Sequence, residues 1–150
     1  MPDLVGFSSI GFVCLLTYIL AARWRDISNI IFVALLVRII VILIGHYVAP
    51  LPDSTADART FEGIAFNLSK EGFHHILDRY PGPSPRFISW LLSIPYYLFG
   101  RSILMAQSIS MLFGIGSVFM GWMLAKKILD KRIAKKVAWT IALFPSLILY

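Results

Sequence analysis

The chain has 150 residues, of which 58% are hydrophobic and 15% charged, with a formal net charge of +6. Soluble globular domains are roughly 45–50% apolar, so this composition excludes an ordinary soluble domain and favours a protein that crosses a membrane several times. The single cysteine, Cys14, excludes an intrachain disulfide.

The first two apolar segments predict two membrane-spanning helices. Residues 4–22 have roughly the 20-residue length that a bilayer requires, and Arg23 and Arg25 follow them. Residues 30–48 form the second predicted span, with Arg38 near its middle. A lone charge at that depth costs roughly 2.5–3.5 kcal/mol on insertion scales. We therefore expect Arg38 to snorkel to the interface, to pair with an acid or to meet a phosphate.

Residues 49–101 form the longest polar interruption in the chain, and we expect them to be a loop outside the membrane. From Asp57 onward, apolar residues recur with the spacing of one helical face. They are Phe61, Ile64, Ala65, Leu68 and Gly72. This amphipathic helix is expected to rest on the membrane surface, with Asp53 and Asp57 at its entrance and Glu62 solvated on its other side.

The second half of this loop predicts a short interfacial helix. Residues 80–85 (YPGPSP) are rich in proline and must be irregular. Residues 87–99 are apolar, but a helix of this length reaches only about 20 Å, against the roughly 30 Å of a hydrocarbon core. Length therefore favours a helix that lies at the interface or re-enters the membrane. The expected interfacial anchors are Trp90, Tyr96, Tyr97 and Trp122.

The last third of the chain predicts one complete span and the beginning of another. Residues 102–125 are long enough to cross, and a stripe of small residues along them suits close helix packing. The stripe consists of Ser110, Gly114, Ser117 and Gly121. A basic loop is expected at 126–136. Residues 137–150 begin a further span that is too short to cross within the sequence.

The placement of charge predicts the orientation. The segment 126–136 holds six cations and one acid, and Arg23 and Arg25 lie in the other short loop. The positive-inside rule places both on the cytoplasmic side, which leaves the N-terminus and the loop 49–101 outside. The basic excess is thus a topology signal and not a nucleic-acid patch. The predicted fold class is an all-α polytopic protein of the cell (inner or plasma) membrane, with interfacial amphipathic helices in its first large outer loop.

An ordered set of short motifs accompanies this layout. The pattern D-A-x-x-F-x-x-x-A-x-x-L-x-x-x-G starts at Asp57, L-F-G-R-S covers residues 98–102, A-Q-S-x-x-x-L-F-G covers 106–114, and A-L-F-P-S-L-I-L-Y ends the chain. In these motifs and their order, residues 38–150 resemble the N-terminal part of C-type membrane glycosyltransferases, in the glycosyltransferase family 39-like group of protein O-mannosyltransferases and aminoarabinose transferases. Such enzymes are several times longer, so the resemblance implies that residues 1–150 are an N-terminal portion without activity of its own.

The resemblance implies transfer of a hexosyl or pentosyl group from a polyprenyl-phosphate donor to an acceptor glycan, lipid or protein on the outer face. Asp57 or Asp53 would take the acceptor's proton. The candidates for holding the departing phosphate are Arg86, Arg59 and Arg101. Some relatives pair two adjacent acids, whereas three residues separate Asp53 from Asp57, and the choice of base stays open. No cofactor is implied, although some relatives bind a divalent cation through loop acids.

Interpretations without catalysis also stay open. Ser54-x-x-Asp57 resembles a capping box, in which Asp57 serves only the start of a helix. The chain also fits a non-enzymatic small membrane subunit, or a transporter fragment, whose outer loop docks a partner. The adjacent His74 and His75 suggest a metal only weakly, because neighbouring residues on one helix rarely coordinate together. No metal ligands are predicted.

Overall fold

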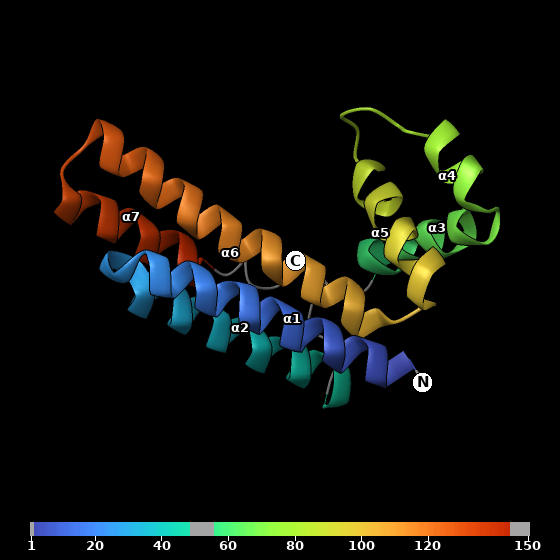
Figure 1. Ribbon diagram of the computed structural model, residues 1–150, viewed down its shortest axis with the longest axis horizontal. Helices are drawn as coiled ribbons and strands as arrows, with labels where there is room; N and C mark the ends of the chain where they lie inside the picture. Colours follow the sequence, from blue (N-terminus) through green and yellow to red (C-terminus); the bar gives the residue numbers. More distant parts are fainter. Residues whose placement is uncertain (1, 49–55, 145–150) are drawn as a thin grey trace.

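The computed structural model describes residues 2–48 and 56–144, with their side chains except at residues 2 and 56–58. Within these residues every regular element is a helix, which confirms the all-α prediction (Figure 1). The elements are α1 (Pro2–Arg23), the 3-10 helix η1 (Arg25–Ile27), α2 (Ser28–Tyr47), α3 (Ala56–Lys70), α4 (Phe73–Asp78), α5 (Phe87–Phe99), α6 (Ile103–Ile128) and α7 (Lys131–Leu143).

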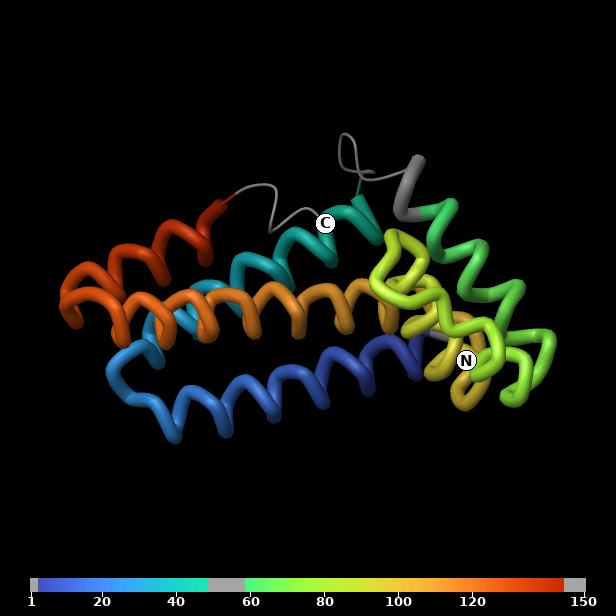
Figure 2. The backbone as a smooth tube through the Cα atoms, turned by 90° about the horizontal axis from the view of Figure 1, so that it is seen from above, coloured from blue at the N-terminus to red at the C-terminus, as the bar shows by residue number. Residues whose placement is uncertain are grey.

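Three helical segments are long and apolar enough to cross a membrane. They are Asp3–Arg23, Arg25–Tyr47 and Ile103–Ile128, with 21, 23 and 26 residues. At about 1.5 Å per residue even the shortest reaches roughly 30 Å, which is the thickness of a hydrocarbon core. Figures 1 and 2 show α1, α2 and α6 side by side in an elongated body, with α7 folded back along α6.

The core of this body runs along the facing sides of α2 and α6, where Ile31, Ile115 and Val118 are at most 1% exposed. At the end where α6 finishes, the buried indole of Trp122 meets Trp24 edge to face, with the ring centroids 5.6 Å apart. The prediction that Trp122 is an interfacial anchor is wrong, because the neighbouring core side chains cover its ring completely.

The stripe of small residues on α6 is divided between two neighbouring helices. A Cβ added at Gly114 would press on Arg38 of α2, and one added at Gly121 would overlap a side chain of α7. Ser110 and Ser117 are exposed instead. The prediction of close packing therefore holds for the two glycines and is wrong for the two serines, because the four residues do not all face one helix.

Arg38 lies inside this body. Its side chain is 2% exposed, and Nη1 donates hydrogen bonds to the backbone carbonyls of Ala34 (3.1 Å) and Ala142 (3.3 Å). Ala142 belongs to the last turn of α7, where the carbonyls lack partners within the helix and a cation is favourable. The expectation that Arg38 snorkels to the interface is therefore wrong, since this side chain joins α2 to the end of α7.

The basic segment 126–136 is mostly helical, so the expectation of a loop there is wrong. α6 continues to Ile128 and α7 begins at Lys131, which leaves only Leu129 and Asp130 in the turn. The physical reason is that α7 is amphipathic, with buried alanines at every fourth position and exposed cations before and between them. The alanines are Ala134, Ala138 and Ala142, and the cations are Lys131, Arg132, Lys135 and Lys136.

The helices α3, α4 and α5 form a lobe beside the start of α6. The helix expected from Asp57 is α3, and the short helix expected at 87–99 is α5. Residues 80–85 contain no regular helix, as predicted. Figures 1 and 2 show the lobe at the end of the long helices where α1 and α6 begin. Gly72 and Gly100 have φ angles of 99° and 84°, which glycine adopts readily, and they let the chain reverse after α3 and α5.

Candidate functional site at the junction of α3, α5 and α6

The face of α3 that packs on the protein is not its most apolar face. Glu62, Ala65 and Ser69 are buried there, and Ala65 packs with residues of α5. The expectation that Glu62 is solvated is therefore wrong, because its side chain points at the end of α5. Ile64 is 38% exposed, and Phe61 is only half-buried. The apolar face predicted to lie on a membrane thus stays partly open.

Glu62 accepts hydrogen bonds from two residues at the end of α5. Nε of Arg101 donates to Oε1 (2.8 Å), and Nη2 of Arg101 donates to Oε2 (2.7 Å). The hydroxyl of Tyr96 donates to Oε1 (3.0 Å), with the carbonyl oxygen of Ser102 as a second acceptor 3.2 Å away. This two-point contact between a guanidinium and a carboxylate is the strongest common form of side-chain hydrogen bonding, and it fixes α3 to the link between α5 and α6.

The environment sets the protonation of this network. Burial raises the pKa of Glu62, but the hydrogen bonds from Arg101 and Tyr96 and the Arg101 charge outweigh it, so the pKa lies below its ordinary value. The bond to Glu62 raises the pKa of Arg101. Burial, together with the Glu62 charge, raises the pKa of Tyr96. At neutral pH the site therefore holds a carboxylate, a guanidinium and a neutral phenol.

Tyr96 is consequently a core residue. It is 3% exposed, and the prediction that it anchors at a membrane interface is wrong, because its hydroxyl is needed inside the protein by Glu62. Tyr97, the next residue, is 47% exposed. Trp90 is partly buried and donates through Nε1 to the carbonyl of Ile76 (2.6 Å), so it joins α5 to α4.

Phe66 gives Arg101 a second fixed neighbour. The guanidinium carbon of Arg101 lies 4.6 Å from the centroid of the Phe66 ring, and Nζ of Lys70 lies 4.1 Å from it. Cations over an aromatic face are attracted by its quadrupole. Arg101 is therefore held by its carboxylate partner and by the ring together, and its position is set by α3.

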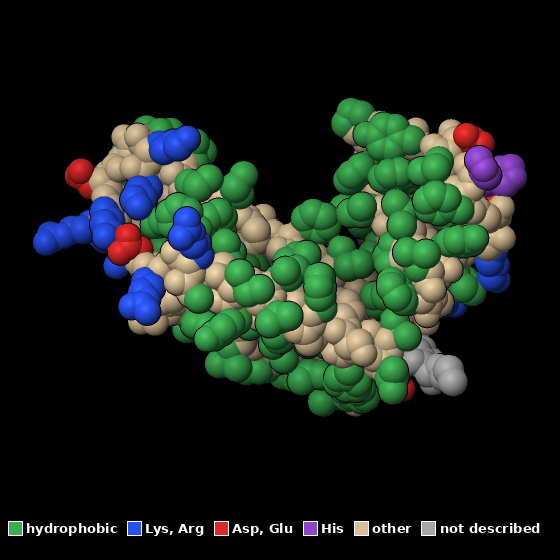
Figure 3. Space-filling view, in the orientation of Figure 1, with side chains coloured by type: hydrophobic (Ala, Val, Ile, Leu, Met, Phe, Trp, Pro, Cys, Tyr) green, Lys and Arg blue, Asp and Glu red, His purple; other side chains and the backbone are tan. Residues whose placement is uncertain are grey.

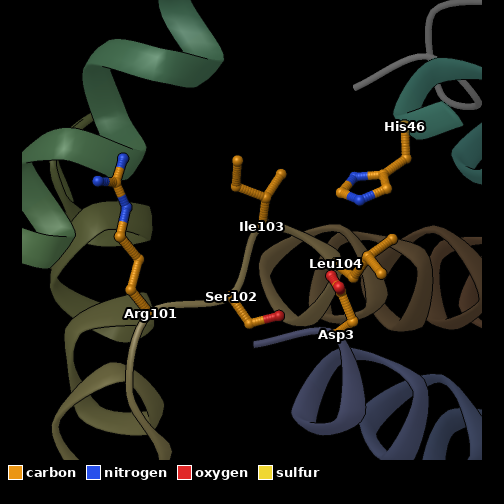
Figure 4. A pocket seen from close by; sticks show the side chains of 6 residues that line it. All are labelled: Asp3, His46, Arg101, Ser102, Ile103 and Leu104. Carbon is orange, nitrogen blue, oxygen red and sulfur yellow. The ribbon is translucent and has the colours of Figure 1, made fainter. Parts of the chain in front are cut away.

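A cavity of about 270 Å³ lies beside this network (Figure 4). Its lining residues come from the starts of α1 and α6, the end of α2 and the link before α6: Asp3, His46, Arg101, Ser102, Ile103 and Leu104. Figure 4 shows the Arg101 side chain directed toward α3, whereas Asp3 and His46 lie around Leu104. The polar side chains that line the cavity from the long helices are thus Asp3 and His46.

The start of α6 is built tightly against α1 at this cavity. The hydroxyl of Ser102 accepts a hydrogen bond from the backbone N–H of Met105 (3.3 Å), which caps the first turn of α6. A Cβ added at Gly6 would lie 2.5 Å from Cβ of Leu104. The close approach of the two helices therefore requires a glycine at this position, and the packed starts of α1 and α6 form one side of the cavity.

The predicted site residues do not all lie at one place in the structure. Asp53 lies outside the described residues, while Asp57 lies in the first turn of α3. Arg59, two residues after Asp57, is exposed. Glu62, midway along α3, reaches the end of α5, and Asp57 and Arg59 lie five and three residues before it, in the half of α3 that begins at this end of the lobe.

Arg86 belongs to the opposite end. It is exposed and directly precedes α5, whereas Arg101 follows it. A helix of 13 residues separates these two arginines by about 20 Å. One phosphate therefore cannot contact both Arg86 and Arg101.

Sequence reasoning missed Glu62, Phe66 and Tyr96 as members of one site. The signal was present in the spacing of Glu62, Ala65, Phe66 and Ser69, which recur at i, i+3, i+4 and i+7 and form the face that packs on α5. A glutamate within such a face needs a cation or donors opposite it. Among the described residues no three histidine, cysteine or acidic side chains cluster as a metal site, and His74 and His75 are exposed on α4.

The fold and site define the protein at the level of an all-α chain with three helices of spanning length and a helical lobe tied to one end of them. No protein-family model, curated protein or solved structure matches this chain. Its function is therefore inferred from its own residues.

Proposed function

We propose that this protein is a multi-pass membrane glycosyltransferase of the inner or plasma membrane. It transfers a sugar from a polyprenyl-phosphate donor to an acceptor glycan, lipid or protein on the outer face. The observation that carries the proposal is the fixed position of α3, whose first turn holds Asp57 and whose Glu62 is bound to Arg101 at the end of the three long helices.

The surface of the long helices supports their placement in a membrane. Large apolar side chains are exposed along each of them, including Phe12 (59%), Leu36 (58%) and Met120 (61%). Each square ångström of such surface costs about 25 cal/mol in water, and extended apolar surfaces mark contacts with a membrane or another protein. A bilayer around α1, α2 and α6 removes this cost along their whole length.

Charge supports the proposed orientation. Lysine and arginine side chains gather at the end where α6 passes into α7, as Figure 3 shows. Arg23, Arg25 and Lys126 belong to that end, which is cytoplasmic under the positive-inside rule. The lobe of α3 to α5 then lies at the outer face. Phe61, Ile64 and Leu68 of α3 rest on the lipid surface, beside the phosphate of a donor whose polyprenyl chain stays in the bilayer.

The proposed chemistry needs a base and a stabilised leaving group. Asp57 takes the proton of the acceptor hydroxyl or amine while that oxygen or nitrogen attacks the anomeric carbon. The bond between the anomeric carbon and the phosphate oxygen breaks, and the polyprenyl phosphate departs as an anion. Arg59 and Arg101 supply positive charge at the same end of the lobe. Glu62 holds Arg101 in position.

The test replaces Asp57 by asparagine in the complete gene product, assayed in membranes with a radiolabelled polyprenyl-phosphate sugar. Asparagine caps a helix about as well as aspartate but accepts no proton. Transfer should fall by roughly 10²–10⁴-fold, which is the usual contribution of a general base. Asp78→Asn, an exposed acid of α4, is the matched control and should keep full activity.

Asp53→Asn in the same assay decides which aspartate is the base. Full activity of Asp57→Asn with loss in Asp53→Asn would move the base to Asp53. Full activity of both variants would remove the catalytic role of this loop. It would favour the alternative function, a non-enzymatic membrane subunit or transporter part whose outer lobe docks a partner.

A further inference from the structure

A second cavity, of about 420 Å³, lies at the opposite end of the long helices from the lobe. It is formed by the last turn of α1, by η1 and by the last turn of α6. Its lining residues are Ala22, Arg23, Trp24, Arg25, Asp26 and Lys126. Figure 3 shows the gathering of basic side chains at this end of the molecule.

The charges of this cavity do not cancel. Asp26 is the only acid that lines it, and its two oxygens face Lys131 (2.8 Å) and Lys126 (3.9 Å). Among the described residues, neither Arg23 nor Arg25 has an acidic oxygen within 4.0 Å. Both arginines are exposed, so their guanidinium groups are available to an anion.

Two tryptophan rings hold the third cation of the cavity, Lys126, in position. The half-buried ring of Trp24 packs against the buried Trp122. Nζ of Lys126 lies 4.7 Å from the Trp122 centroid and 5.9 Å from that of Trp24. The partly exposed Trp24 is of a residue type that favours the level of lipid headgroups, and the faces of both rings attract the ammonium group. The cavity is therefore backed by two packed tryptophan rings, and basic side chains surround its opening.

An apolar strip continues from this opening along α1. Ile19 and Leu15 precede Arg23 by four and eight residues, so they share its helical face. They are 57% and 55% exposed. A molecule whose phosphate lies at Arg23 can thus place a hydrocarbon chain along Ile19 and Leu15, which a free phosphate ion cannot do.

We propose that this cavity binds the phosphate of an anionic membrane phospholipid. Arg23 and Arg25 donate charge-assisted hydrogen bonds to the phosphate oxygens, Lys126 adds positive charge, and the acyl chains follow Ile19 and Leu15. Basic pockets between helix ends on the cytoplasmic side bind anionic headgroups in this way. The inference rests on the membrane orientation proposed above but not on glycosyl transfer.

The experiment measures lipid retention by native mass spectrometry, with the full-length protein released from micelles that contain phosphatidylglycerol or phosphatidylcholine. The wild type should retain phosphatidylglycerol preferentially. In Arg23→Gln/Arg25→Gln the apparent Kd for phosphatidylglycerol should rise about 30-fold, because each cation near a headgroup contributes about 1 kcal/mol. Arg23→Lys/Arg25→Lys keeps both charges and should lose much less.

The matched control is Arg132→Gln/Lys136→Gln, which removes two exposed cations of α7 that do not line the cavity. It should bind phosphatidylglycerol like the wild type. An equal loss in this control would overturn the site in favour of a diffuse positive surface. Equal retention of phosphatidylcholine would overturn it as well, and so would displacement of the lipid by millimolar inorganic phosphate. Circular dichroism of each variant ensures that a loss reflects binding and not unfolding.

Discussion

Arg101 donates hydrogen bonds to both carboxylate oxygens of Glu62, with donor–acceptor distances of 2.8 Å and 2.7 Å. The side chain of Glu62 is 11% exposed and that of Arg101 is 47% exposed, so this pair is partly shielded from water and screened less than a surface pair. It connects two segments that lie 39 residues apart in the sequence. This ion pair thus connects α3 to the segment that leads into α6.

Replacing Glu62 by glutamine should lower the free energy of unfolding by about 1–3 kcal/mol, because Arg101 and Tyr96 lose a charged acceptor. Unfolding in mixed micelles titrated with a denaturing detergent measures the change. The matched control is Glu71→Gln, which breaks the exposed pair of Glu71 with Arg79 and should cost roughly 0–1 kcal/mol. An equal effect of both variants would contradict the special role of Glu62.

The same residue predicts a pH dependence. The pKa of Glu62 is raised by burial but lowered more by Arg101 and Tyr96, with a net position below its ordinary value of 4.5. A depressed carboxyl pKa contributes stability that is fully present above the unfolded-state pKa and is lost as the pH falls through the folded-state pKa. Melting temperatures measured from pH 6 downward should therefore fall less steeply below about pH 4.5 in Glu62→Gln than in the wild type. Parallel curves would show that the acid sensitivity arises elsewhere.

Gly114→Ala tests the packing around Arg38. The added Cβ would lie 2.6 Å from Nε and 3.3 Å from Cζ of Arg38, whose Nη1 is bound to the carbonyls of Ala34 and Ala142. Because the arginine is fixed at its far end, relief requires α2 or α6 to move, at a cost of about 1–3 kcal/mol. Detergent unfolding measures this loss. Gly116→Ala meets nothing within 4 Å and should be neutral or stabilising by up to about 1 kcal/mol.

Cysteine labelling tests the membrane orientation. In a Cys14→Ala background, His75→Cys on α4 and Arg132→Cys on α7 place single thiols at two exposed positions. A membrane-impermeant maleimide added to intact cells should label the first, and it should label the second only after permeabilisation. Labelling of Arg132→Cys from outside would reverse the orientation, whereas labelling of both in intact cells would show that the long helices do not separate the two ends.

The helices were largely predictable because their signals are local. Length and apolar content predict α1, α2 and α6, and the proline-rich segment 80–85 together with Gly100 delimits α5. The break between α6 and α7 was misplaced, because the count of cations in 126–136 predicts orientation and not conformation. The spacing of Ala134 and Ala138 would have corrected it.

The polar contacts were not predictable, because they join distant segments. Glu62 on α3 and Arg101 in the link after α5 each look like surface residues, and only the packing of α3 on α5 brings them together. Arg38 is a comparable case. The sequence shows a charge within an apolar segment, but its Nη1 donates to the backbone carbonyls of Ala34 and Ala142, and a carbonyl carries no residue-type signal.

The bond between Arg38 and Ala142 also imposes an order on biosynthesis. The two residues lie 104 positions apart, so at roughly 5–20 residues per second the ribosome adds Ala142 about 5–20 s after Arg38. During that interval the Ala34 carbonyl, on the same helix, is already in place to receive the arginine. Docking of α7 then completes the site, and the newly made α2 reaches this environment only when α7 arrives.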